Sequence, residues 1–162
     1  MGLTELPFEQ RGRIYRSPMP FGKYDPEGLV YPTYRSNSIS TIVLLAEEEE
    51  CIKKAGENLR VLYIGDGFEL VHLPIVDFGI PDPTKLEGAL FQTASEAKAG
   101  RHIVFHCSAG VGRTALFAVC LARILLNLSG QKALDWVRQY IPGAVETSQQ
   151  QQFVNALTVH LN

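Results

Sequence analysis

A cysteine and an arginine frame a short, glycine-containing segment in the second half of the chain: Cys107-Ser108-Ala109-Gly110-Val111-Gly112-Arg113. The apolar run Ile103–Phe105 precedes it and predicts a buried strand, and the apolar run Ala115–Ala122 follows it and predicts a buried helix. A small loop that leads into a helix directs backbone N–H groups and the positive end of the helix dipole at one point, where they favour an anion. A cysteine in such surroundings, here Cys107, is expected to favour its thiolate form over the thiol.

Arg113 completes the expected anion-binding loop. Its planar guanidinium can pair with two oxygens of one anion, a geometry that suits a phosphate group. A thiolate held against a phosphate ester can attack phosphorus and form a phosphocysteine, which divides hydrolysis into two displacements. The sequence therefore predicts that residues Ser108 to Arg113 bind a phosphate in front of the Cys107 sulfur. A buried structural cysteine is the alternative interpretation.

Two segments resemble a known family. The string His106-Cys107-x-x-Gly110-x-x-Arg113-Thr114 resembles the signature of the protein tyrosine phosphatases. The short chain and its segment 72–81 resemble the small dual-specificity branch, and the similarity extends from about residue 13 to the C-terminus. The resemblance implies that Cys107 is the nucleophile, that His106 orients the loop and favours the thiolate, and that Arg113 binds the equatorial oxygens. Thr114 is expected to hydrogen-bond the cysteine sulfur or to cap the helix.

A phosphatase of this kind also needs a group that protonates the leaving oxygen and then activates water. Asp77 and Asp82 are the candidates. Asp77 follows a predicted strand, and its setting Ile-Val-Asp-Phe-Gly resembles the acid loop of the small phosphatases. Asp82 stands between two prolines at an expected helix start, where aspartate commonly caps the helix or complements its dipole. We expect Asp77 to be the general acid, and an ordinary turn residue is the alternative.

A run of four glutamines, Gln149 to Gln152, lies near the C-terminus. The larger tyrosine phosphatases use a glutamine in a comparable place to position the hydrolytic water, which would give Gln150 a supporting role. Thr147-x-x-Gln150 also has the form of a capping box at a helix start. We favour the capping box.

Three cysteines, Cys51, Cys107 and Cys120, are an odd number and have no metal-binding spacing. This pattern predicts a reducing compartment, no metal and no cofactor. Some relatives protect the nucleophile with a second cysteine, but the matching position here is Ala46. Cys120 falls within the apolar helix, so we expect it in the core and expect no such disulfide.

Strands alternate with helices along the chain, and the crossovers are long enough for parallel pairing. This order predicts an α/β three-layer sandwich, in which helices flank a central, mostly parallel, twisted sheet. The segment 58–64 fits helix or strand, and Thr84-Lys85-Leu86-Glu87 resembles a capping box. We expect strands over 13–16, 38–45, 68–74 and 103–105, and helices over 47–55, 84–99, 115–127, 131–140 and 147–161.

The composition predicts one domain over residues 1–162, because 46% of its residues are hydrophobic. A net charge of −2 does not favour nucleic acid or an acidic membrane as partners. The N-terminus lacks the pattern of a signal peptide, and the longest apolar run, Ala115–Leu128, is too short to cross a bilayer. We therefore expect a cytoplasmic monomer that acts on a phosphoprotein or a small phosphorylated substrate.

The loop residues between Cys107 and Arg113 carry no charge. Members of the resembled family that act on inositol phosphates tend to have basic residues in this loop, so the resemblance implies a monophosphate ester. The loop matches the tyrosine-specific enzymes through Thr114, so we rank phosphotyrosine first and phosphoserine or phosphothreonine second. An inositol-phosphate or other small-molecule phosphatase and a non-catalytic phosphate-binding module remain open. The nearby tyrosines either wall a pocket or, as we favour, lie on the surface: Tyr24, Tyr31 and Tyr34.

Overall fold

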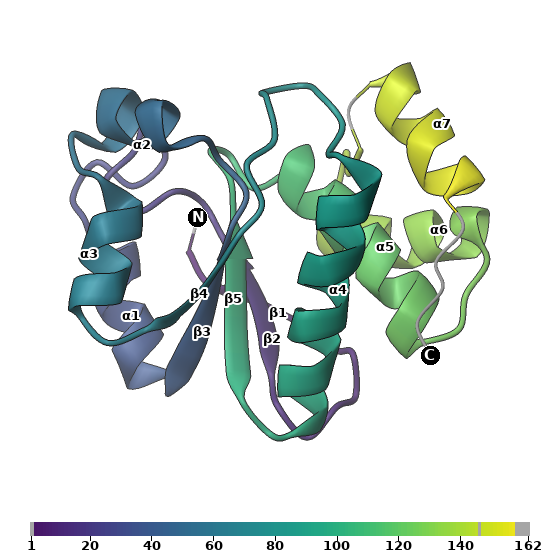
Figure 1. Ribbon diagram of the computed structural model, residues 1–162, viewed down its shortest axis with the longest axis horizontal. Coiled ribbons are helices and arrows are strands. Elements are labelled where there is room, and N and C mark those ends of the chain that lie inside the picture. Colours follow the sequence, from purple (N-terminus) through teal and green to yellow (C-terminus); the bar gives the residue numbers. More distant parts are fainter. Residues whose placement is uncertain (1, 146, 158–162) are drawn as a thin grey trace.

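The computed structural model, which describes residues 2–145 and 147–157, is built around one sheet with the strand order β1-β2-β5-β3-β4 (Figure 1). The β1–β2 pair is antiparallel, and β2, β5, β3 and β4 are parallel to one another. The mostly parallel sheet predicted from the sequence is therefore confirmed. The strands are β1 (Thr4–Leu6), β2 (Ile14–Ser17), β3 (Ile39–Leu44), β4 (Glu69–His72) and β5 (His102–His106).

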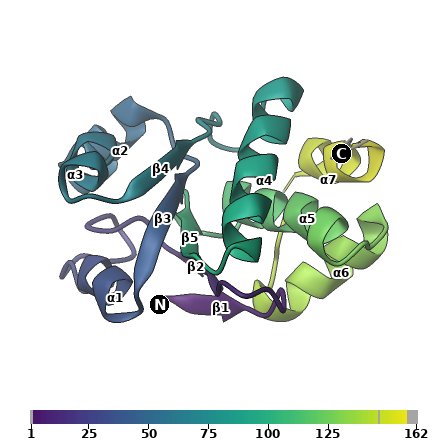
Figure 2. The same ribbon diagram turned by 60° about the horizontal axis from the view of Figure 1, so that its bottom comes forward.

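Helices cover both faces of the sheet, as Figures 1 and 2 show. The first three, α1 (Val30–Ser36), α2 (Glu48–Ala55) and α3 (Leu59–Gly65), lie on one face. The other face is covered by α4 (Pro83–Lys98), α5 (Arg113–Leu125), α6 (Gly130–Tyr140) and α7 (Ser148–Ala156). This arrangement confirms the predicted three-layer α/β sandwich. Among residues 2–145 and 147–157, no helix has both the length and the apolar character needed to cross a bilayer.

The two central strands, β3 and β5, are apolar on both sides because helices pack against both of their faces. Val43 and Phe105 belong to the core beneath α4 and α5, whereas Ile42 and Val104 belong to the core beneath α1 and α3. The first ten residues of α5, from Arg113 to Ala122, are all buried. A helix that is buried all round reads as a continuous apolar run, which is why the sequence revealed it.

Two short elements were not predicted. The strand β1 pairs with β2 in register with Glu5 opposite Tyr15, and three residues are too few to give a periodic signal. The helix α1 contains Pro32, which usually argues against a helix. Here the proline lies in the first turn, where backbone N–H groups have no intrahelical acceptor.

Side-chain caps explain the conformation of segment 58–64 and the position at which α4 begins. The ambiguous segment 58–64 is helical in α3, and the side chain of Asn58 caps it by accepting a hydrogen bond from the Val61 N–H. At the start of α4, Asp82 caps the helix by accepting from the Thr84 and Lys85 N–H groups, which confirms the cap expected of an aspartate at this position. The predicted capping box at Thr84 was therefore wrong. The predicted end of the last helix, residues 158–161, lies outside the described residues.

The Asp82 cap gives a stability prediction. Asp82→Ala should lower the free energy of unfolding by about 1 kcal/mol, because two N–H groups at the start of α4 lose their acceptor. Thr84→Ala leaves this cap intact and serves as the matched control. Urea denaturation of both variants checks the assignment, and an equal loss in the two would contradict it.

Candidate active site

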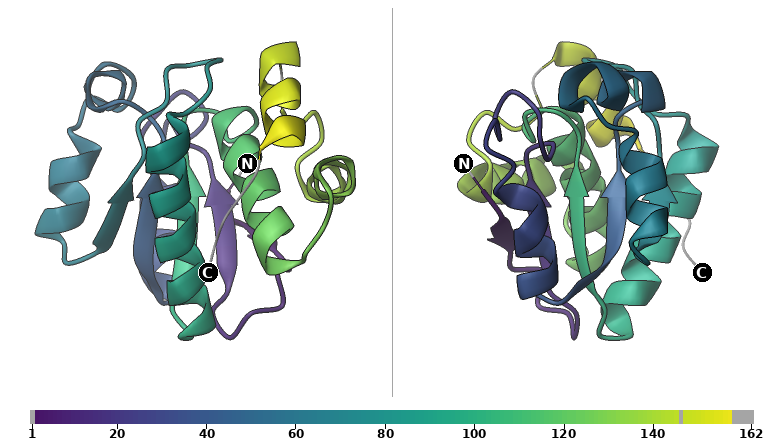
Figure 3. Two further views of the ribbon diagram at one scale, coloured as in Figure 1. Left: turned by 45° about the vertical axis from the view of Figure 1, so that its right-hand side comes forward. Right: turned by 90° about the vertical axis from the view of Figure 1, so that its left-hand side faces the viewer.

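The carboxyl ends of the parallel strands meet at one edge of the sheet, and the candidate site lies there (Figure 3). Beyond β5, the chain passes through Cys107 to Gly112 and enters α5 at Arg113. Two backbone hydrogen bonds hold this loop from outside. Leu45 N–H donates to the His106 carbonyl over 3.0 Å, and Met19 N–H donates to the Ser108 carbonyl over 2.8 Å.

Gly110 adopts a left-handed conformation with φ of +84°. A Cβ atom there would lie 3.0 Å from the Ser17 carbonyl oxygen, so both the conformation and the available space require glycine. Within the described residues, the backbone N–H groups of Ser108 to Gly112 donate to no protein acceptor. Such a loop, placed at a helix N-terminus, can donate several hydrogen bonds to one anion.

The thiol of Cys107 is almost fully buried, at 3% exposure. The Thr114 hydroxyl donates to its sulfur over 3.1 Å. The residue before α5 is Gly112, which has no side chain to cap the helix. Of the two expected roles of Thr114, the geometry therefore shows the contact with sulfur. Cys107 forms part of a cavity of about 430 Å³, lined by Lys23, Tyr24, Lys54, Asp77, Phe78, Cys107, Ser108, Ala109, Gly112 and Arg113.

The Arg113 guanidinium is buried at 2% exposure and forms a two-point ion pair with Glu50. Its Nη1 and Nη2 donate to the two Glu50 carboxylate oxygens over 3.0 and 2.8 Å, and Nη1 also donates to the Ile75 carbonyl over 2.9 Å. Burial by itself lowers the pKa of Arg113, but the hydrogen bonds to Glu50 raise it above its usual value. Arg113 therefore keeps its positive charge in the interior.

Glu50 was missed by the sequence analysis. It belongs to a run of four glutamates, Glu47 to Glu50, and such a run at a helix start indicates a solvated, dipole-matched terminus. In the structure, its carboxylate is instead the ion-pair partner of the buried Arg113 guanidinium. Only the expectation that a buried arginine needs an acidic partner could have prompted a search for it.

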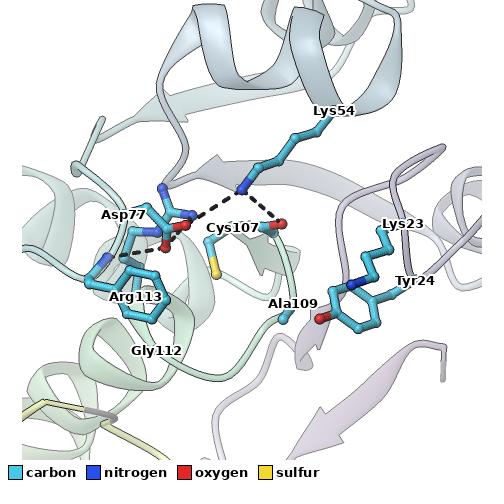
Figure 4. Close-up of a pocket in the computed structure, with 10 residues that line it drawn as sticks. Lys23, Tyr24, Lys54, Asp77, Cys107, Ala109, Gly112 and Arg113 are labelled. Atoms are coloured by element: carbon cyan, nitrogen blue, oxygen red, sulfur yellow. Dashed lines mark hydrogen bonds and ion pairs between the residues drawn. The ribbon is translucent and has the colours of Figure 1, made fainter.

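Asp77 lies at the mouth of the same cavity, as Figure 4 shows. One carboxylate oxygen is 3.3 Å from Arg113 Nη2, and the other is 3.5 Å from Lys54 Nζ. Lys54 also lies 3.6 Å from Glu50 and within 3.4 Å of the Ser108 hydroxyl. The structure therefore brings Asp77, Cys107 and Arg113 together, whereas Asp82 caps α4 and does not line the cavity.

His106 is fully buried next to Cys107. Burial lowers its pKa to about 4; the hydrogen bond to the Cys107 carbonyl opposes this shift and the charge of Arg113 reinforces it. The ring is thus neutral near pH 7. Nδ1 lies 3.1 Å from the Cys107 carbonyl, which can only accept, so Nδ1 carries the proton. Nε2 then accepts from the Tyr63 hydroxyl over 2.7 Å. The neutral His106 ring therefore links Tyr63 to the start of the loop through two hydrogen bonds.

The capping box that the sequence predicted at the start of α7 is confirmed. Thr147 Oγ1 accepts from Gln150 N–H, and Gln150 Oε1 accepts from Thr147 N–H. The side-chain amide of Gln150 also donates to the Gly79 carbonyl over 2.9 Å. The assignment of this residue to the hydrolytic water stays a prediction.

The three tyrosines have separate environments. Tyr31 is half-buried against the core on the α1 side of the sheet, and its hydroxyl donates to Asp66 Oδ2 over 2.5 Å. Tyr24 lines the cavity and is 43% exposed, whereas Tyr34 is fully buried and its hydroxyl hydrogen-bonds Ser17 Oγ over 2.7 Å. The expectation of a surface position was therefore wrong for Tyr34, which packs in the core between α1 and the sheet. The buried carboxylate of Asp25, which accepts from the N–H groups of Phe21 and Leu29, fixes the segment that carries Tyr24.

Cys51 and Cys120 are buried free thiols. Burial raises the pKa of Cys51 to about 11 and that of Cys120 to about 12, so both stay protonated near pH 7. The predicted core position of Cys120 is confirmed. Among the described residues, no group of three or more histidine, cysteine, aspartate or glutamate side chains is arranged to hold a metal ion.

Comparison with known proteins defines the class. The family model described as "Polymorphic toxin system, DSP-PTPase phosphatase" matches residues 22–130. Cyclin-dependent kinase inhibitor 3 of Rattus norvegicus is 31% identical over 123 residues, which cover 75% of this chain and 58% of that protein. The Homo sapiens counterpart is also 31% identical, and the match covers 79% of this chain and 63% of that protein. This chain therefore spans about three fifths of the curated relatives that it first matches.

Solved structures of phosphatases are similar to this chain over most of its length. Kinase-associated phosphatase, with its catalytic cysteine substituted by serine, superposes with a TM-score of 0.80 and 25% identity, covering 94% of this chain and 90% of the other. Tk-PTP in its active form gives a TM-score of 0.73 with 28% identity, covering 92% of each chain. The chain belongs to the DSP-PTPase phosphatase family. Within the protein tyrosine phosphatase superfamily, its place is the small dual-specificity branch.

The neutral, buried His106 gives a prediction on stability and pH. The unfolded chain binds a proton at this residue below about pH 6.5, whereas the folded protein does so only near pH 4. The stability contributed by neutral His106 is thus present above pH 6.5 and is lost as the pH falls toward 4, by at most about 3 kcal/mol.

Urea denaturation between about pH 7 and pH 4.5 measures this effect in the wild type and in His106→Gln. The stability advantage of the wild type over the variant should shrink as the pH falls. The half-buried His102, in a His102→Gln variant, is the control for histidine removal in general. A pH-independent difference between the wild type and His106→Gln would contradict the neutral assignment.

Proposed function

We propose that this chain hydrolyses phosphate monoesters on proteins through a phosphocysteine intermediate, with phosphotyrosine as the first substrate and phosphoserine or phosphothreonine as the second. One observation carries the proposal: Cys107, Asp77 and Arg113 line a single cavity, although Asp77 comes from a different loop. Membership of the dual-specificity phosphatase family supports it. The cytoplasmic location and the monomeric state stay predictions from composition.

In the first step, the Cys107 thiolate attacks phosphorus, and the bond between phosphorus and the ester oxygen breaks. The loop N–H groups and Arg113 face the three equatorial oxygens, over which the transition-state charge is spread. Asp77, in its protonated form at the mouth of the cavity, gives its proton to the leaving oxygen. The products of this step are the free alcohol or phenol and a phosphocysteine.

In the second step, water attacks the phosphocysteine. The Asp77 carboxylate accepts a proton from that water, the phosphorus–sulfur bond breaks, and inorganic phosphate leaves. The Thr114 hydroxyl, which already donates to the Cys107 sulfur, stabilises the thiolate that departs. The cycle returns Cys107 as a thiolate and Asp77 as an acid, so it needs no redox partner.

Aromatic walls favour an aryl phosphate as the substrate. Tyr24 and Phe78 line the cavity, and their rings are 43% and 57% exposed. Rings placed in this way can contact the phenyl ring of a phosphotyrosine whose phosphate reaches the floor. The loop at that floor offers one binding place for phosphate and has no charged side chain between Cys107 and Arg113.

A second candidate function rests on the lysines of the rim. Lys23 and Lys54 also line the cavity, and both come from outside the phosphate loop. They would suit a substrate with further phosphate groups, such as an inositol phosphate. Lys54 already contacts Glu50 and Asp77, which neutralises part of its charge, so the protein substrate ranks first.

The nucleophile is tested by Cys107→Ser. We expect hydrolysis of p-nitrophenyl phosphate, measured with EDTA present, to disappear in the variant because serine is a far weaker nucleophile here. Binding of inorganic phosphate, followed by calorimetry, should persist since the loop N–H groups and Arg113 are unchanged. Turnover that survives the substitution would exclude the phosphocysteine route.

The general acid is tested by Asp77→Asn. Hydrolysis of phenyl phosphate, which has a poor leaving group, should slow by about 10²- to 10⁴-fold. An aryl phosphate with a strongly electron-withdrawn leaving group needs little protonation and should slow far less. Asp82→Asn is the matched control, because Asp82 caps a helix outside the cavity. Equal losses on both substrates would count against the role of Asp77.

A further inference from the structure

The side chain of Gln150 connects two segments that are 71 residues apart in the sequence. It is fully buried, and its Nε2 donates to the backbone carbonyl of Gly79 over 2.9 Å. Gly79 belongs to the loop of residues 75–82, called here the acid loop, which carries Asp77. The helix α7 is thus tied directly to the segment that supplies the proposed general acid.

The acid loop is a tight turn with little freedom at its tip. Gly79 N–H donates to the Val76 carbonyl over 2.8 Å, which closes a turn around Asp77 and Phe78. Phe78 has a positive φ of 62°, a conformation that costs free energy for a non-glycine residue. A Cβ atom on Gly79 would lie 2.8 Å from the Val76 carbonyl oxygen. Such a turn holds its shape only where its ends are fixed.

Two side chains fix those ends. Arg113 Nη1 donates to the Ile75 carbonyl over 2.9 Å before the turn, and Gln150 Nε2 donates to the Gly79 carbonyl over 2.9 Å after it. Asp77 lies between these two attachments, and its carboxylate is 3.3 Å from Arg113 Nη2. The Arg113 attachment belongs to the phosphate-binding machinery, whereas the Gln150 attachment comes from a helix outside the matched family segment, residues 22–130.

We propose that Gln150 is a positioning residue for the general acid: it anchors the acid loop through Gly79 and so keeps Asp77 beside Arg113, in the cavity that Cys107 also lines. This inference rests on the proposed function. It predicts that Gln150 serves the step in which the leaving oxygen is protonated. The residue acts through Asp77 and does not touch the substrate.

The contacts of the Gln150 side-chain amide favour this role over the placement of the hydrolytic water. Gln150 Nε2 points to the Gly79 carbonyl, and Oε1 accepts from Thr147 N–H. Gln150 is not among the residues that line the cavity. Each polar end of the side chain therefore makes a hydrogen bond to the protein backbone, and these contacts suit an anchor of the acid loop.

Substitution with glutamate separates the anchor from the helix cap. Gln150→Glu keeps an oxygen that can accept from Thr147 N–H, and Thr-x-x-Glu is itself a capping box. The carboxylate has no N–H group to donate to the Gly79 carbonyl, so the anchor is lost while α7 stays capped. Gln150→Ala removes both contacts. Gln149→Ala, at an exposed neighbour on the same helix, is the matched control.

The kinetic test compares two aryl phosphates, one with a poor and one with a very good leaving group. For both Gln150 variants, kcat on the poor leaving group should fall about 3- to 10-fold, the expected effect of losing one hydrogen bond. The kcat on the substrate with the good leaving group should be nearly unchanged, because that group needs little protonation. The Gln149→Ala variant should have the wild-type kcat on both substrates. An equal loss on both substrates, accompanied by a burst of released phenol, would assign Gln150 to the water step and overturn the proposal.

Hydrogen exchange provides a measurement that needs no activity. Backbone amides of residues 76–80 should exchange faster in Gln150→Glu than in the wild type and in Gln149→Ala, because the turn has lost one attachment. Unchanged exchange in Gln150→Glu would overturn the anchor even if kcat fell. A wild type that hydrolyses neither substrate would refute the proposed function, and the exchange rates would still decide whether Gln150 anchors the loop.

Discussion

The buried guanidinium of Arg113 organises the site. Placing a charge at 2% exposure is unfavourable unless it is paired and hydrogen-bonded, and Glu50 from α2 together with the Ile75 carbonyl meets that requirement. Removing one partner of a buried ion pair typically costs about 3–5 kcal/mol. The partners of Arg113 come from α2 and from the acid loop, and Arg113 itself ends the loop that carries Cys107. These contacts therefore fix the relative positions of all three segments.

The sheet brings these segments within reach of one another. In a parallel sheet, the carboxyl ends of the strands share one edge, so the segments that follow β3, β4 and β5 converge there (Figure 3). Glu50 follows β3, Asp77 follows β4 and Cys107 follows β5. The proposed nucleophile, the proposed general acid and the ion pair that holds Arg113 therefore meet, although their residues are far apart in the chain. The C-terminal helix α7 contributes the further attachment at Gly79.

Much of the fold could be predicted from the sequence, because the patterns that identify most helices and strands lie within single elements. The apolar run of α5, the β-branched strand β3 and the glycine-ended helix α2 each follow from residues within one element. The elements that were missed or misassigned depend on a single contact or on position. Pro32 is tolerated because it falls in a first turn, and Asp82 replaces Thr84 as the cap because its carboxylate reaches two N–H groups.

The sequence by itself determined the chemistry of the loop, since Cys107, Gly110, Arg113 and Thr114 act at fixed spacings across one strand–helix junction. Gly110 illustrates the reason: its positive φ of 84° belongs to that short turn and suits glycine. The lack of space for a Cβ atom is a tertiary effect, because the Ser17 carbonyl oxygen of β2 lies there. Only the tertiary structure decided which partners those residues have. That Glu50 pairs with Arg113, and that Gln150 holds Gly79, depends on side chains that meet across 63 and 71 residues of chain. No local pattern encodes such contacts, because they arise from the packing of whole elements around the sheet.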